Sequence, residues 1–165
     1  MHRLNRADLL DAAGGTEVVP VYPAEIEIVS GREVLQCLRL SPNGIYRWYA
    51  GCCNTPVANT KPGFPWAGVV HRMYSVQDPG YLQRTLGPIK SRIKGRFARG
   101  TPPSGTAADI DLKGFKTVLP FLLKGMLLGK GKHSPFFQQD GRTPIVQPVV
   151  VSLEERNALR QKLGF

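Results

Sequence analysis

Residues 33–56 read EVLQCLRLSPNGIYRWYAGCCNTP and carry the clearest structural pattern in the chain. Two largely apolar runs, 33–40 and 45–50, flank a Ser-Pro-Asn-Gly sequence. Because Pro, Asn and Gly are favoured in tight turns, this arrangement predicts a β-hairpin in which Cys37 lies opposite Trp48. One face of the hairpin then carries the residues that we expect in the core: Leu35, Cys37, Tyr46, Trp48 and Ala50.

The patterns along the whole chain favour an α+β fold with mainly antiparallel strands. We expect a β-rich region over residues 1–76, which begins with a short helix at 6–13. Residues 77–165 are expected to form a basic C-terminal extension with two helices, at 112–128 and 152–163, packed on the same domain. Further strands are expected at residues 16–22, 24–29, 69–76 and 145–151.

The first of the two C-terminal helices is predicted from apolar residues at alternating spacings of three and four: Leu112, Phe115, Leu119, Leu122 and Met126. We expect this apolar face to pack in the core. Pro120 either kinks the helix or lies in its first turn after an N-cap at Thr117. Ser152 and Glu155 form a capping-box sequence at the start of the last helix.

Composition limits the class of protein. The chain has 165 residues and 42% hydrophobic residues, which is enough for one ordinary core. It has no run of roughly 20 apolar residues that would span a bilayer, and its first residues do not resemble a secretory signal. With only three cysteines, we expect reduced thiols and a cytoplasmic location.

The net charge of +10 is concentrated in one part of the chain. Residues 1–60 hold five Lys or Arg and six acidic residues, whereas residues 61–165 hold 17 and six, a net charge of +11. Six cations and no acidic residue occur in 84–99, the basic segment. Such asymmetry is typical of a protein with an anionic partner, and also of a merely soluble surface.

Cys52 and Cys53 are the candidate metal ligands, because a thiol pair in the turn after a hairpin strand is where zinc ribbons place their donors. Adjacent cysteines rarely chelate one ion well, so idle or packed thiols are the alternative. Only six residues of the chain are soft donors: His2, Cys37, Cys52, Cys53, His71 and His133.

Residues 5–70 resemble the glutathione-dependent formaldehyde-activating enzyme family, which includes centromere protein V and has a zinc-centred β-tent of small antiparallel sheets. In that family a hairpin strand ends in an aromatic residue followed by C-x-x-C-G-[ST]-P. Tyr49 matches the aromatic residue, and residues 53–56 (Cys-Asn-Thr-Pro) match the second cysteine and its successors, with Asn54 for Gly. The resemblance is closest to an uncharacterised bacterial branch.

One ligand position of this pattern falls on Ala50, and the family's other cysteines would lie upstream of His2. The resemblance therefore implies a relative of zinc-dependent carbon–sulfur lyases with an incomplete zinc site. These enzymes add a thiol such as glutathione to a small aldehyde, and zinc acts as a Lewis acid. Residues that we expect to hold the carboxylates of the thiol are Lys90, Arg92, Lys94 and Arg96.

The alternative is a non-catalytic binding module on the same scaffold, whose basic half contacts nucleic acid or anionic lipid. Only Tyr81 and Phe97 are aromatic near the basic segment, which argues against a stacking platform for nucleic acid. The apolar stripe of residues 112–126 is more typical of core than of a membrane-bound helix. We therefore expect a small thiol or aldehyde as the partner, rather than nucleic acid or a membrane.

Overall fold

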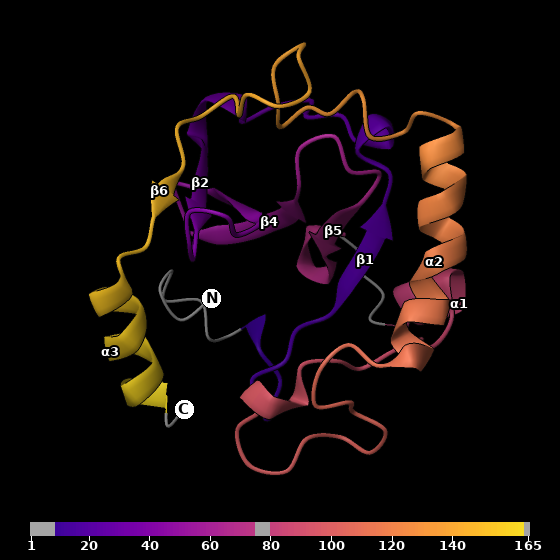
Figure 1. Cartoon of the computed structure of the whole chain (residues 1–165), viewed down its shortest axis with the longest axis vertical. Helices are drawn as coiled ribbons and strands as arrows, with labels where there is room; N and C mark the ends of the chain where they lie inside the picture. Colours follow the sequence, from indigo (N-terminus) through magenta and orange to yellow (C-terminus); the bar gives the residue numbers. More distant parts are fainter. Residues whose placement is uncertain (1–8, 75–79, 164–165) are drawn as a thin grey trace.

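The computed structural model describes residues 9–74 and 80–163. Its strands join in one six-stranded sheet with the order β1-β5-β4-β3-β2-β6 (Figure 1). The strands are β1 (Val18–Val21), β2 (Leu35–Arg39), β3 (Tyr46–Ala50), β4 (Thr55–Thr60), β5 (Ala67–Val70) and β6 (Val149–Val150). Neighbouring strands are antiparallel except β2 and β6, which are parallel. The expected α+β, mainly antiparallel class is confirmed.

The predicted hairpin is formed by β2 and β3. Cys37 pairs with Trp48, as expected, and Leu35 pairs with Ala50. The turn is closed by the Gly44 N–H, which donates to the Ser41 carbonyl oxygen at 2.9 Å. Because a shift of one residue would turn every side chain to the other face, this turn fixes which residues enter the core.

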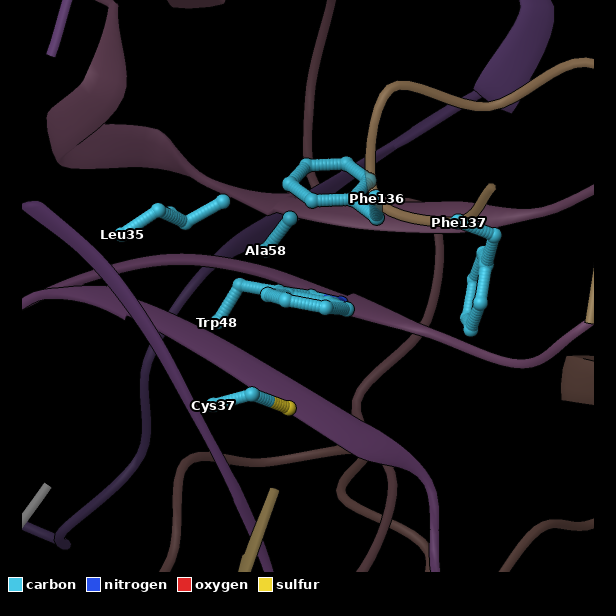
Figure 2. Packing of buried hydrophobic residues seen from close by; sticks show 6 residues of the cluster. All are labelled: Leu35, Cys37, Trp48, Ala58, Phe136 and Phe137. Atoms are coloured by element: carbon cyan, nitrogen blue, oxygen red, sulfur yellow. The ribbon is translucent and has the colours of Figure 1, made fainter. Parts of the chain in front are cut away.

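The core is centred on Trp48, which is fully buried between the hairpin and a later loop (Figure 2). Its ring stacks on Phe136 with centroids 5.1 Å apart and meets Phe137 edge-on at 6.0 Å. Its indole Nε1–H donates to Thr60 Oγ1 at 2.8 Å, so each of these two buried polar atoms has a hydrogen-bond partner. Since Phe136 and Phe137 come from the second half of the chain, both halves share this core.

In the described part of the chain, three α-helices accompany the sheet: α1 (Tyr81–Leu86), α2 (Leu112–Leu127) and α3 (Leu153–Leu163). Asp111 caps α2 by accepting from the Gly114 N–H at 2.8 Å, and Ser152 Oγ accepts from the Glu155 N–H at 3.0 Å before α3. The predicted start of the last helix at Ser152 is confirmed. The N-cap expected at Thr117 is wrong, and Pro120 lies inside α2. None of the described helices is long and apolar enough to cross a membrane.

Several predicted elements are shorter than expected or absent. Residues 24–29 form no strand, because Pro23–Glu25 makes a 3-10 turn, although Ile26 and Ile28 still pack against the core. β5 ends at Val70, and the 3-10 turn His71–Met73 follows it. Short 3-10 turns also occur at Arg32–Val34 and Gly95–Phe97.

Of the helix expected at residues 6–13, residues 6–8 lie outside the described residues. Its described end is a turn, in which the Gly15 N–H donates to Asp11 Oδ1 at 2.7 Å and the Gly14 N–H donates to the Asp11 carbonyl oxygen. Asp commonly closes local turns in this way, which competes with helix formation. Residues 11–13 are therefore not helical.

The face by which α2 contacts the protein is not the predicted one. Phe121 stacks on Tyr22 with centroids 4.1 Å apart, and the Tyr22 hydroxyl donates to the Phe121 carbonyl oxygen at 2.9 Å. A Cβ atom at Gly125 would lie only 2.6 Å from the Tyr22 ring and 2.7 Å from Pro65 Cβ, so the helix approaches closely there. The expected core residues Leu112, Phe115 and Met126 are exposed instead.

Candidate functional site

The two candidate thiols lie in the connection between β3 and β4. The Gly51 N–H donates to the Val34 carbonyl oxygen at 2.7 Å, which anchors the turn to the residue before β2. Asn54 has φ 57°, in the left-handed region that Asn and Gly adopt most readily. Cys52 and Cys53 lie in the turn after the hairpin strand, as the sequence predicts, and both are exposed.

The two thiols interact with each other. A hydrogen bond to Cys53 raises the pKa of the Cys52 thiol above its ordinary value. Cys53 Sγ also lies 3.1 Å from Thr55 Oγ1. The raised pKa keeps the Cys52 thiol protonated until a cation displaces the proton, because metals bind thiolates.

The donor set for zinc is incomplete among residues 9–74 and 80–163. No group of three or more His, Cys, Asp or Glu side chains that could hold a metal ion occurs in that part of the chain. Cys37 is buried in the core, where burial raises the pKa of its thiol to about 12. The ring of His71 lies against the Glu17 carbonyl oxygen at 3.3 Å. The turn thus contains two soft donors, Cys52 and Cys53, whereas a structural zinc ion takes four.

The four expected anion-binding residues fall into two pairs. Lys94 and Arg96 both form ion pairs with Asp109, and the bond from Lys94 holds the pKa of the Asp109 carboxyl below its usual range. The side chains of Lys90 and Arg92 are exposed, and no ion pair involves them in the described part of the chain. Of the four residues predicted to bind an anion, Lys90 and Arg92 therefore have no ion pair in the described part of the chain, whereas Lys94 and Arg96 share Asp109.

Hydrogen bonds hold the basic segment against residues 106–109. The Gly95 N–H donates to the Ala107 carbonyl oxygen at 2.8 Å, and the Arg96 N–H donates to that of Ala108 at 3.2 Å. A Cβ atom at Gly114 would lie 3.1 Å from Ser91 Oγ and 3.4 Å from Ile93 Cγ2. The basic segment therefore packs against the first turn of α2.

Two open depressions occur on the described surface, on α2 and α3, and neither is lined by a cysteine. One lies on α2 beside Leu112, Lys113, Lys116 and Thr117. The other lies on α3.

The exposed apolar face of α2 is the feature that the sequence did not predict. Gly114, Phe121 and Gly125, which share the opposite side of the helix, are the pattern that indicates its orientation.

The fold and the thiol turn define an α+β protein with a mainly antiparallel sheet and two solvent-facing cysteines at one strand connection. A family model matches residues 1–147. The chain belongs to that family, which is described as a family of unknown function, DUF6151. No curated protein and no solved structure matches the chain.

Proposed function

We propose that this protein is a relative of the glutathione-dependent formaldehyde-activating enzymes, in which the Cys52–Cys53 turn supplies part of a zinc site. The contact between two exposed thiols is the observation that supports this proposal. The left-handed conformation of Asn54 also supports it, because the family pattern has glycine there and glycine adopts that conformation without strain.

The reaction proposed for the completed site is addition of a thiol to an aldehyde. A sulfur–carbon bond forms, the carbonyl π bond breaks, and the thiol proton ends on the new hydroxyl oxygen, so no oxidant or reductant is needed. A bound zinc ion would supply Lewis-acid chemistry. Lys90 and Arg92 are the residues of this chain proposed to bind the carboxylates of an acidic thiol such as glutathione.

The metal content of the purified chain, measured by elemental analysis after exposure to zinc and gel filtration, tests the zinc site. We expect about one zinc ion per chain and a loss of zinc in Cys53→Ser, because the family pattern places a ligand at Cys53. Cys52→Ser is the matched variant, since both residues are exposed in one turn. Cys37→Ala is the control that removes a thiol outside the turn.

Absence of zinc from the unmodified chain would refute the metal site. Equal retention by all three variants would also refute it, because no turn thiol would then be a ligand. For the reaction itself, the measurement is the rate of adduct formation from glutathione and formaldehyde by NMR, with and without the zinc-loaded protein. A rate equal to the uncatalysed one would exclude the enzymatic function.

The second proposed function is a binding module for an anionic, phosphate-bearing partner. Exposed cations at Lys90 and Arg92 support it. A Lys90→Gln, Arg92→Gln variant is expected to lower affinity for inorganic polyphosphate and to flatten its salt dependence. Lys94→Gln, Arg96→Gln is the matched control, because these two cations are already paired with Asp109. Equal effects of both double variants would contradict the assignment.

We also propose that the protein works in the cytoplasm. None of its three cysteines, all of which lie in the described part of the chain, forms a disulfide, and two of them are exposed. Exposed thiols persist in a reducing compartment and are oxidised in a secretory one. Fluorescence microscopy of a tagged full chain, with fractionation as a second measurement, tests the location.

A further inference from the structure

Helix α2 presents an apolar face that the fold does not use. The large residues of this outer face have exposed fractions between 48% and 88%: Leu112, Phe115, Leu123, Met126 and Leu127. The helix contacts the protein through the opposite side, at Gly114, Phe121 and Gly125. Figure 1 shows α2 at one side of the molecule, beside β1. Clusters of exposed apolar residues of this kind mark interaction surfaces.

The charged side chains within α2 are all positive, and the acidic residue next to them is the N-cap Asp111. Lys116 lies among the apolar residues of the outer face, Lys113 and Lys124 lie to one side of it, and all three are exposed to solvent. The basic segment extends the positive surface, since Ser91 and Ile93 pack against the first turn of the helix. The apolar face therefore extends along the whole helix, with one lysine within it and two lysines on one side of it.

The charge pattern discriminates between occupants. In a symmetric dimer the same patch would meet itself, so the lysines of two copies would face each other without any acidic partner on α2. An anionic lipid surface complements both features, because its acyl chains accept apolar side chains and its headgroups accept lysine. With 16 residues, or about 24 Å, α2 suits a position in the plane of the interface and not across it.

We infer that the outer face of α2 docks onto the surface of a bilayer that contains anionic lipids. The apolar residues enter the boundary between headgroups and acyl chains, and the three lysines contact lipid phosphates and carboxylates. This inference rests on the second proposed function, for which it names the partner, and it does not depend on the thiol turn. The expectation against a membrane partner assumed that the stripe at residues 112–126 is core, and the exposure of Leu112, Phe115 and Met126 removes that ground.

Vesicle flotation of the full chain tests the inference. The protein is expected to float with phosphatidylcholine vesicles that contain phosphatidylserine, to stay below vesicles of phosphatidylcholine alone, and to detach as salt rises. Replacing Lys113, Lys116 and Lys124 by Gln should lower the partition coefficient roughly tenfold or more. The matched control replaces three exposed cations elsewhere, Arg142, Arg160 and Lys162, by Gln and should have a smaller effect.

Leu127→Gln tests the apolar contribution and should weaken flotation several-fold, because the side chain enters the acyl boundary. Val29→Gln is its control, since Val29 and Leu127 are both 88% exposed. Both controls leave α2 unchanged. Circular dichroism of the variants checks that the helix remains.

Equal binding to neutral vesicles, or full binding by the triple lysine variant, would overturn the inference. Flotation that requires Lys90 and Arg92 but not α2 would overturn it and leave the second proposed function standing. Binding of an oligonucleotide in place of vesicles would have the same consequence. A concentration-dependent dimer that Leu127→Gln dissociates, without flotation, would identify a second copy of the chain as the occupant and refute the lipid surface.

Discussion

Trp48 and Leu127 are both large apolar residues in regular secondary structure, yet Trp48 is 1% exposed and Leu127 is 88% exposed. Around Trp48, two strands and the Phe136–Phe137 loop exclude water, and the indole N–H has a partner. The helix that carries Leu127 contacts the protein from its opposite side, where Gly114, Phe121 and Gly125 lie. Stability therefore resides in the sheet, whereas the apolar surface of α2 remains available for binding.

The strongest test of this difference is to replace Trp48 and Leu127, each in turn, by alanine. Trp48→Ala should lower the free energy of unfolding by about 3–5 kcal/mol, because it empties the centre of the core and removes the bond to Thr60. Leu127→Ala should change it by no more than about 0.5 kcal/mol. Urea unfolding measures both. Comparable losses would mean that α2 contributes to the same core.

The close approach at Gly125 gives the next largest effect. Gly125→Leu places side-chain atoms where Tyr22 and Pro65 already lie, which should cost about 1–3 kcal/mol and loosen α2 from the sheet. Hydrogen exchange should then rise in α2 and stay slow in β3. Lys124→Leu adds the same side chain on the exposed side and should do neither.

The buried thiol of the sheet should make stability sensitive to alkaline pH. Burial raises the pKa of Cys37 from about 9 to about 12, so between these values the unfolded chain has lost a proton that the folded chain keeps. Stability therefore falls as pH rises, by up to about 1.4 kcal/mol per pH unit. The measurement is urea unfolding at pH 9 and above. In Cys37→Ala this part of the slope should disappear, and an unchanged slope would contradict the assignment.

Unlike the buried Cys37, the exposed thiols should affect the rate of chemical modification and leave the free energy of unfolding unchanged. Cys53→Ala removes the hydrogen bond that raises the pKa of Cys52, so more Cys52 thiolate is present at a given pH below that pKa. Alkylation of Cys52 by iodoacetamide, followed by mass spectrometry, should become a few-fold faster. Thr55→Val keeps both thiols and serves as the control. An unchanged rate in Cys53→Ala would show that the thiols do not interact.

The sequence predicted the strand register and the start of a helix correctly where a single turn or cap determines them. The Ser41–Gly44 turn set the register of Cys37 and Trp48, and Ser152 marked the start of α3. The orientation of α2 was missed, because a spacing of three and four residues identifies an apolar stripe without showing what covers it. Its contacts with Tyr22 and Pro65 join residues far apart in the chain.

The candidate site shows the same division. The position of Cys52 and Cys53 in the turn after a hairpin strand was predicted from the sequence, and the structure agrees, whereas their exposure is known from the structure alone. The ion pairs of Lys94 and Arg96 with Asp109 were not predicted, since they depend on how the basic segment folds back along residues 106–109. Charge counting gives the total charge of a segment and leaves its internal pairing undetermined.

The parallel pairing of β6 with β2 has a consequence for synthesis on the ribosome. Val149 and Val150 complete the sheet beside Leu38 and Arg39, and the lid over Trp48 is formed by Phe136 and Phe137. While the nascent polypeptide is shorter than this, the hairpin exposes an aromatic surface and an open strand edge, both of which attract other chains. We expect newly made protein to need a chaperone until its last quarter has emerged from the exit tunnel.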